Sequence, residues 1–162
     1  MISATRMKKE SHSYSLPPRL RRARDFRSVR RYGKRVALAF LVMYISRRSG
    51  SHPSRDANER ADRVGFVVPM KSIRGAVRRN RVRRLMKEAV RLWWPYIPQG
   101  HDILLIAGRE PECDHAWYVE AVFLRMLLKM QMLTSDGIVK AEEKLASLPD
   151  EFSGGLRRGE GA

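Results

Sequence analysis

The chain has 162 residues, of which 43% are hydrophobic, a formal net charge of +16 and one cysteine. This hydrophobic content excludes a wholly disordered chain, and the lone Cys113 excludes an internal disulfide. No apolar run approaches the ~20 residues of a membrane-spanning helix, and the N-terminal sequence does not resemble a secretory signal. Together these features predict a cytoplasmic protein with one folded domain.

The positive charge is concentrated in the first two thirds of the chain. Residues 1–50 carry 14 basic and 2 acidic side chains, residues 51–100 carry 12 and 4, and residues 101–162 carry 7 and 11. This uneven distribution indicates a directed positive face, which favours a nucleic-acid partner. An acidic membrane surface is a weaker alternative, because the apolar helix faces are needed for a core.

Composition divides the chain into three segments. We expect a disordered basic arm at residues 1–18 and a folded body at residues 19–133. An acidic, glycine-containing extension follows at residues 134–162, where a short helix could form at residues 139–148. The folded body is long enough to bury a core of its own.

Hydrophobic periodicity and stop signals define the elements of this body. Gly33 ends the first helix, and Pro95 and Pro98 end the second. The elements expected in chain order are a helix at 24–32, strands at 40–46 and 63–68, a basic helix at 75–93, a strand at 102–107 and a helix at 115–133. This order predicts an α+β fold, in which helices pack on a mixed sheet as a small two-layer sandwich.

The basic helix has two separate faces. Seven of the fourteen residues at 74–87 are Arg or Lys, and none is acidic. At 100° per residue, one arc of about 120° is apolar and another of about 140° is cationic. The apolar arc contains Val82, Leu85, Met86, Ala89, Leu92 and Trp93, and the cationic arc contains Arg79, Asn80, Arg83, Arg84, Lys87 and Arg91.

A solvated helix face usually mixes Glu with Lys or Arg, because opposite charges one turn apart stabilise the helix. Glu88 is the only acidic residue in the basic helix, and it lies outside the cationic arc. Arginine is also suited to bidentate contacts with phosphate. The pattern therefore indicates a bound polyanion rather than a solvated surface.

Other functional classes have weaker support. A metal-dependent nuclease needs clustered carboxylates, and Asp102 has no evident acidic neighbour. Cys113 and His115 alone make an incomplete zinc site. His101 and Asp102 point to opposite faces if both lie on a strand. We therefore expect no catalytic residue and no metal or cofactor bound by the protein alone.

Two alternatives with nucleic-acid partners remain. One is a helix-turn-helix DNA-binding protein, which requires a helix where residues 64–68 predict a strand. The other is a structural RNA-binding protein, similar to a ribosomal protein, with no role in catalysis. A cleavage assay tests the second alternative, because a structural protein would not change RNA cleavage.

The segment R-N-R-V-R-R-L at residues 79–85 resembles the R-N-R-x-[KR]-R motif of the bacterial ribonuclease P protein component. The tripeptide alone is a weak signal, but its position in a basic helix between strands is specific. The resemblance covers residues 19–133. It includes R-L at 19–20, D-F at 25–26, Val29, Gly33, F-L-V-M-Y at 40–44, R-V-G-F at 63–66 and D-I-L-L-I-A at 102–107.

This resemblance implies a four-stranded mixed sheet with a left-handed β-α-β crossover, which most proteins avoid. It also implies a protein subunit that binds a catalytic RNA and helps it remove the 5′ leader from precursor tRNA. The RNA, with bound Mg²⁺, performs the chemistry. The protein is expected to act as a monomer in a 1:1 ribonucleoprotein and to have no membrane as a partner.

The resemblance also implies site residues. A cleft between the first helix and the sheet holds the single-stranded leader, where an aromatic ring can stack a base. Two positions depart from the family pattern, because Met70 replaces a lysine and Arg30 replaces a frequent aromatic residue. The candidates for the leader are Phe26, Arg30, Tyr44 and Lys71, and those for the catalytic RNA are Arg74, Arg78, Arg79, Asn80, Arg81, Arg83, Arg84, Lys87 and Arg91.

Overall fold

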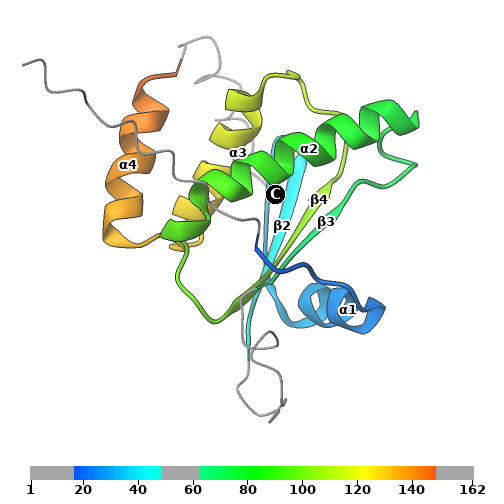
Figure 1. The fold of residues 1–162 in the computed structure, drawn as a ribbon, viewed down its shortest axis with the longest axis horizontal. Coiled ribbons are helices and arrows are strands. Elements are labelled where there is room, and N and C mark those ends of the chain that lie inside the picture. Colours follow the sequence, from blue (N-terminus) through cyan, green and yellow to red (C-terminus); the bar gives the residue numbers. More distant parts are fainter. Residues whose placement is uncertain (1–16, 49–62, 149–162) are drawn as a thin grey trace, which may run out of the picture.

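The computed structural model describes residues 17–48 and 63–148, which form a four-stranded sheet with helices on both faces (Figure 1). Nearly all of the expected basic arm, and the end of the C-terminal extension, lie outside the described residues. Within the described part of the chain, no helix is long and apolar enough to cross a membrane.

The sheet has the strand order β1-β2-β4-β3. β1 pairs antiparallel with β2, β2 pairs antiparallel with β4, and β3 pairs parallel with β4. A parallel pair needs a crossover connection, and the helix α2 supplies it between β3 and β4. The strands are β1 (Lys34–Leu38), β2 (Leu41–Arg47), β3 (Arg63–Val67) and β4 (His101–Ala107).

This arrangement confirms the α+β class and the four-stranded mixed sheet. The left-handed sense of the crossover stays an expectation from the family resemblance. The periodicity of the sequence did not predict β1, because only Val36 of its five residues is buried. The turn into β2 also lacks the usual glycine or asparagine signal, since Ala39 itself adopts a positive φ of 50°.

The helices lie close to their expected positions. Gly33 ends the first helix, as expected, and its N–H donates to the carbonyl of Val29. A Cβ at Gly33 would lie 2.4 Å from that carbonyl oxygen, so only glycine fits there. The helices are α1 (Ala23–Tyr32), α2 (Ala76–Trp93), the short 3-10 helix η2 (Trp94–Tyr96), α3 (Ala116–Lys129) and α4 (Ser135–Ala146).

The two faces of the sheet bury different helices. Along β4, Ile103 and Leu105 belong to the cluster that contains buried residues of α2 and α3, such as Met86. Leu104, between them, packs with Val29 of α1 on the other face. Side chains alternate along a strand, so this apolar run is continuous because both faces are covered.

The helix α4 adds to the folded body that we expected to end at Leu133. It begins four residues before the expected helix, where the Thr134 hydroxyl accepts a hydrogen bond from the Gly137 N–H. Thr134 also donates its N–H to the carbonyl of Tyr96 at 2.8 Å, and Ala141 is fully buried. These contacts attach α4 to η2 and α3. The helix α3, expected to continue to residue 133, ends at Lys129.

Candidate RNA interface

The structure confirms that α2 has one buried and one outward face. Val82, Met86, Ala89 and Trp93 are buried, as the apolar arc predicted. Leu92 was also assigned to this arc, but 38% of its surface is exposed. Leu92 lies about 120° from Met86 around the helix axis, at the edge of the arc, and the buried Val90 lies about 40° from Met86 on the other side.

Two arginines of α2 that lie outside the cationic arc pair with acidic side chains from another part of the chain. Arg78 forms an ion pair of 3.0 Å with Glu110, and Arg81 forms one of 3.5 Å with Asp114. Both acids belong to the loop between β4 and α3. Exposed pairs of this kind contribute about 0–1 kcal/mol, so a phosphate can replace the carboxylate at little cost.

The other candidates for the catalytic RNA have different environments. Arg83 donates to the Asn80 side-chain oxygen at 3.1 Å, and Arg79 donates to the Ile73 carbonyl at 3.3 Å. Arg91 pairs with Glu88, one turn earlier on the same helix. Within residues 17–48 and 63–148, the side chains of Arg74 and Arg84 are exposed and have no hydrogen-bond or ion-pair partner. Arg84 also lines a shallow hollow with Leu85.

Lys87 lies near two other cations. Partial burial, and then the positive charges of Arg19 and Arg83, lower the pKa of Lys87 below its ordinary value. Arg19 precedes α1 and forms a bridge with Val64, so the segment that leads into α1 runs parallel to β3. The positive surface of α2 therefore continues onto a segment more than 60 residues away in the sequence.

A hollow of about 330 Å³ lies where α1, β3 and α2 meet. Phe26, a leader candidate, and Arg83, a catalytic-RNA candidate, both line it. A Cβ at Gly65 would lie 2.8 Å from the Phe26 ring, so the absence of a side chain there permits this packing. The complete lining is Arg19, Leu20, Arg21, Phe26, Val64, Gly65, Phe66 and Arg83.

The structure brings two of the four leader candidates together. Phe26 and Tyr44 are partly buried and belong to one apolar cluster between α1 and the sheet. Arg30 is exposed on α1, and Lys71 is exposed in the turn between β3 and α2. In the described part of the chain, the side chains of Arg30 and Lys71 form no hydrogen bond or ion pair.

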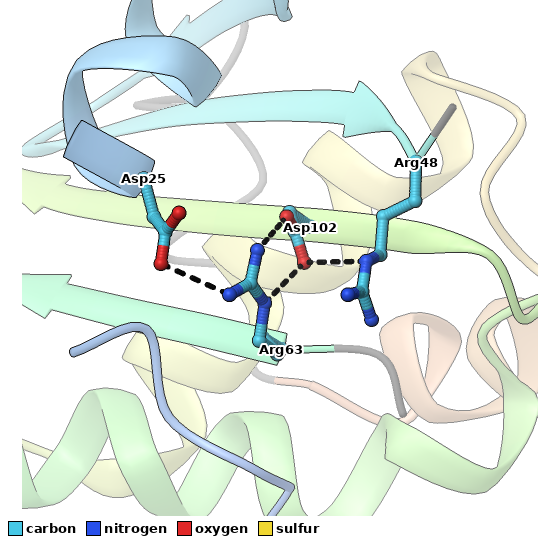
Figure 2. Close-up of polar contacts among 4 residues, drawn as sticks. All are labelled: Asp25, Arg48, Arg63 and Asp102. Carbon is cyan, nitrogen blue, oxygen red and sulfur yellow. Dashed lines mark hydrogen bonds and ion pairs between the residues drawn. The ribbon is translucent and has the colours of Figure 1, made fainter. Parts of the chain in front are cut away.

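An ion-pair network attaches α1 to the sheet (Figure 2). Arg63 on β3 donates to Asp25 of α1 at 2.9 Å and to both oxygens of Asp102 on β4, at 2.7 and 3.1 Å. Arg48 lies 3.9 Å from Asp102. The hydrogen bond to Asp102 raises the pKa of Arg63, so the guanidinium stays protonated.

Sequence reasoning missed this network. It considered Asp102 only as a possible catalytic or metal-binding carboxylate, whereas its partners in the structure are arginines. Asp25 is the single acidic residue in α1, and this isolation could have indicated an ion pair with a basic residue elsewhere in the chain. Among residues 17–48 and 63–148, no group of three or more His, Cys, Asp or Glu side chains could hold a metal ion.

Comparison with known proteins provides a family match. The family model for ribonuclease P matches residues 17–131. The ribonuclease P protein component of Alkaliphilus metalliredigens is 34% identical over 118 residues, which cover 72% of this chain and 96% of that protein. The corresponding protein of Pelotomaculum thermopropionicum is 37% identical, over 70% of this chain and 92% of that protein.

Solved structures agree with this match. The RNase P protein from Thermotoga maritima superposes with a TM-score of 0.52 at 27% identity, over 68% of this chain and 96% of that one. The Staphylococcus aureus RNase P protein has a TM-score of 0.57 at 23% identity, over 72% and 97% of the two chains. The second comparison supports the fold alone.

Proposed function

Because this chain belongs to the ribonuclease P protein family, we propose that it is the protein subunit of a ribonuclease P ribonucleoprotein. In this proposal it binds the catalytic RNA and the 5′ leader of precursor tRNA, and it promotes removal of the leader. The RNA subunit, with Mg²⁺, performs the hydrolysis. The protein provides binding surfaces, as one chain per RNA in the cytoplasm.

The outward face of α2 is the observation that carries this proposal. It presents a row of arginines on a rigid helix whose opposite face is buried in the core. Phosphate groups are the ligands that such a row fits, since each guanidinium can donate two parallel hydrogen bonds. We assign this face to the catalytic RNA.

The cluster between α1 and the sheet is our candidate for the leader. Phe26 and Tyr44 are partly exposed aromatic side chains on one side of the sheet, and Val67 and Ile106 beside them are also partly exposed. Unpaired bases can stack on such surfaces without sequence preference. Arg19, Arg21 and Arg83 line the adjoining hollow and can neutralise the leader's phosphates.

Reconstitution tests this function directly. The purified chain is added to a bacterial ribonuclease P RNA at a low Mg²⁺ concentration where the RNA alone cleaves poorly. We expect cleavage of precursor tRNA at the leader junction to be restored. Binding of the RNA without any effect on cleavage indicates a structural RNA-binding protein instead.

The leader assignment has its own test. Tyr44→Ala in the assembled enzyme should weaken precursor binding more than binding of mature tRNA, because only the precursor has a leader. The expected loss is about 1–3 kcal/mol at most. Thermal unfolding must show that the variant stays folded, since Tyr44 also contributes to the apolar cluster. Equal losses for precursor and mature tRNA contradict the assignment.

A further inference from the structure

The outward side of α1 carries a second row of arginines. Val29 is buried, and Asp25 and Phe26 are partly buried, so these three residues mark the inner side of the helix. Three exposed arginines lie on the opposite side, at spacings of three and four residues: Arg24, Arg27 and Arg31. They form one stripe about 10 Å long, since an α-helix rises 1.5 Å per residue. We call it the α1 stripe.

No carboxylate balances the α1 stripe within the described residues. The single acid of α1, Asp25, points inward to Arg63. No ion pair or side-chain hydrogen bond in residues 17–48 and 63–148 involves Arg24, Arg27 or Arg31, and the Arg31 guanidinium lies 5.5 Å from the centroid of the Tyr32 ring. Like charges one turn apart destabilise a helix, so the stripe does not serve to stabilise α1.

An exposed aromatic ring lies at the end of the stripe. Tyr32 is 71% exposed, although large hydrophobic side chains usually avoid water, and Arg31 stacks over it. Positive charge beside an exposed aromatic ring is the combination that binds single-stranded nucleic acid, because the cations neutralise phosphates while the ring stacks a base. Duplex RNA offers no unstacked base to such a ring.

The α1 stripe is separate from the surface of α2. The two helices lie on opposite faces of the sheet (Figure 1). The inner side of α1, however, contributes Phe26 to the hollow that we assign to the leader. A single strand that leaves this hollow therefore reaches the outside of α1 by passing around one helix, whose diameter with side chains is about 10 Å.

We propose that the α1 stripe and Tyr32 bind the upstream part of a long precursor leader, beyond the nucleotides held between α1 and the sheet. This inference rests on the proposed function. It predicts that the protein's contribution to precursor affinity depends on leader length.

The test uses the assembled enzyme and two precursors that differ only in the leader. One leader is just long enough for the cleft, and the other extends it by roughly ten nucleotides, within the site sizes of single-strand-binding grooves. The variant is Arg24→Gln/Arg27→Gln/Arg31→Gln. Its control, Arg24→Lys/Arg27→Lys/Arg31→Lys, keeps the charge, and all three residue types have similar helix propensity.

The glutamine variant should bind the long-leader precursor more weakly, and the salt slope of log K should fall in magnitude by about 2, from ~0.7 per single-strand phosphate contact. Affinities for the short-leader precursor and for the RNA subunit should not change. The lysine variant should retain the slope. Tyr32→Ala should weaken long-leader binding about fivefold, the equivalent of ~1 kcal/mol, without changing the slope.

Three results overturn the inference: no change with either precursor, an equal loss with both leaders, or weaker binding of the RNA subunit. The last two place the stripe against the tRNA body or the catalytic RNA. If the proposed function itself is wrong, the result is different: the wild-type chain does not restore cleavage of either precursor.

Discussion

Arg63 on β3 binds Asp25 on α1 across 2.9 Å, and this contact holds the helix that carries Phe26 against the sheet that carries Tyr44. The Arg63 guanidinium is fixed from the other side by Asp102. The separation between α1 and the sheet is therefore set by a charged contact as well as by apolar packing. The leader cleft that we propose depends on that separation.

Asp25→Asn should loosen α1. A hydrogen bond to a charged group contributes about 1.5–3 kcal/mol, and we expect a loss of unfolding free energy near the lower end because Arg63 keeps Asp102. Thermal unfolding measures this loss, with the exposed Glu142→Gln as control. Precursor affinity should fall while affinity for the RNA subunit is retained. A variant as stable as the wild type would show that Asp25 does not hold the helix.

Gly65→Ala should displace Phe26. The new methyl group would lie 2.8 Å from the Phe26 ring and 3.0 Å from Leu20, so α1 must shift outward. Overpacking of this kind typically costs about 1–3 kcal/mol. At Gly108 a Cβ meets nothing nearer than 3.7 Å, so Gly108→Ala is a matched control. We expect lower stability and weaker precursor binding for the first variant only, measured by denaturant unfolding and equilibrium binding.

Arg79→Ala/Arg83→Ala/Arg84→Ala should weaken binding to the RNA subunit. Each lost phosphate contact should reduce the salt slope of log K by about 0.7–0.9. The fold should persist, because none of the three side chains belongs to the buried face of α2. Filter binding over a range of salt concentrations measures the slope, and circular dichroism checks the fold. An unchanged slope would move the RNA interface away from α2.

Lys87 should titrate below the ordinary pKa of lysine. Burial, Arg19 and Arg83 all lower its pKa in the free protein. A bound phosphate favours the charged form of Lys87, so RNA binding should raise its pKa. At pH values between the pKa of the free protein and that of the complex, RNA binding should therefore be accompanied by uptake of a proton. NMR of the labelled lysine side chain, assigned with Lys87→Arg, measures both values. Arg83→Gln should move the pKa of Lys87 in the free protein back toward that of an ordinary lysine. If Lys87 of the unsubstituted free protein titrates at the ordinary lysine pKa, the prediction is wrong.

Truncation after Leu133 should destabilise the protein without abolishing RNA binding. It removes Ala141, which is fully buried, and uncovers Tyr96, to which Lys140 donates a hydrogen bond of 2.6 Å. Figure 1 shows α4 at the opposite end of the molecule from α1. Gly137→Ala is a milder form of the test, since its Cβ would lie 2.7 Å from Tyr96. Melting temperature should fall for both variants, and unchanged melting would show that α4 contributes nothing to stability.

The sequence by itself determined the elements whose signals are local. The apolar and cationic arcs of α2 follow from side-chain order around one helix. Gly33 and Pro95 mark helix ends through their own covalent structure, because Gly33 has no Cβ and Pro95 has no N–H. The R-N-R segment in its helix also indicated the family. These features depend on residues within a few positions of one another, so periodicity is sufficient to predict them.

Only the tertiary structure decided which distant residues meet. Asp25 and Arg63 are 38 residues apart, and Arg78 and Glu110 are 32 apart. β1 and α4 were unpredicted or misplaced because their few buried residues, such as Val36 and Ala141, are buried only by partners elsewhere in the chain. Chain topology sets such contacts, and composition and periodicity do not encode which strand or loop becomes the neighbour. For that reason the shared hollow and the network at Arg63 emerged only from the folded chain.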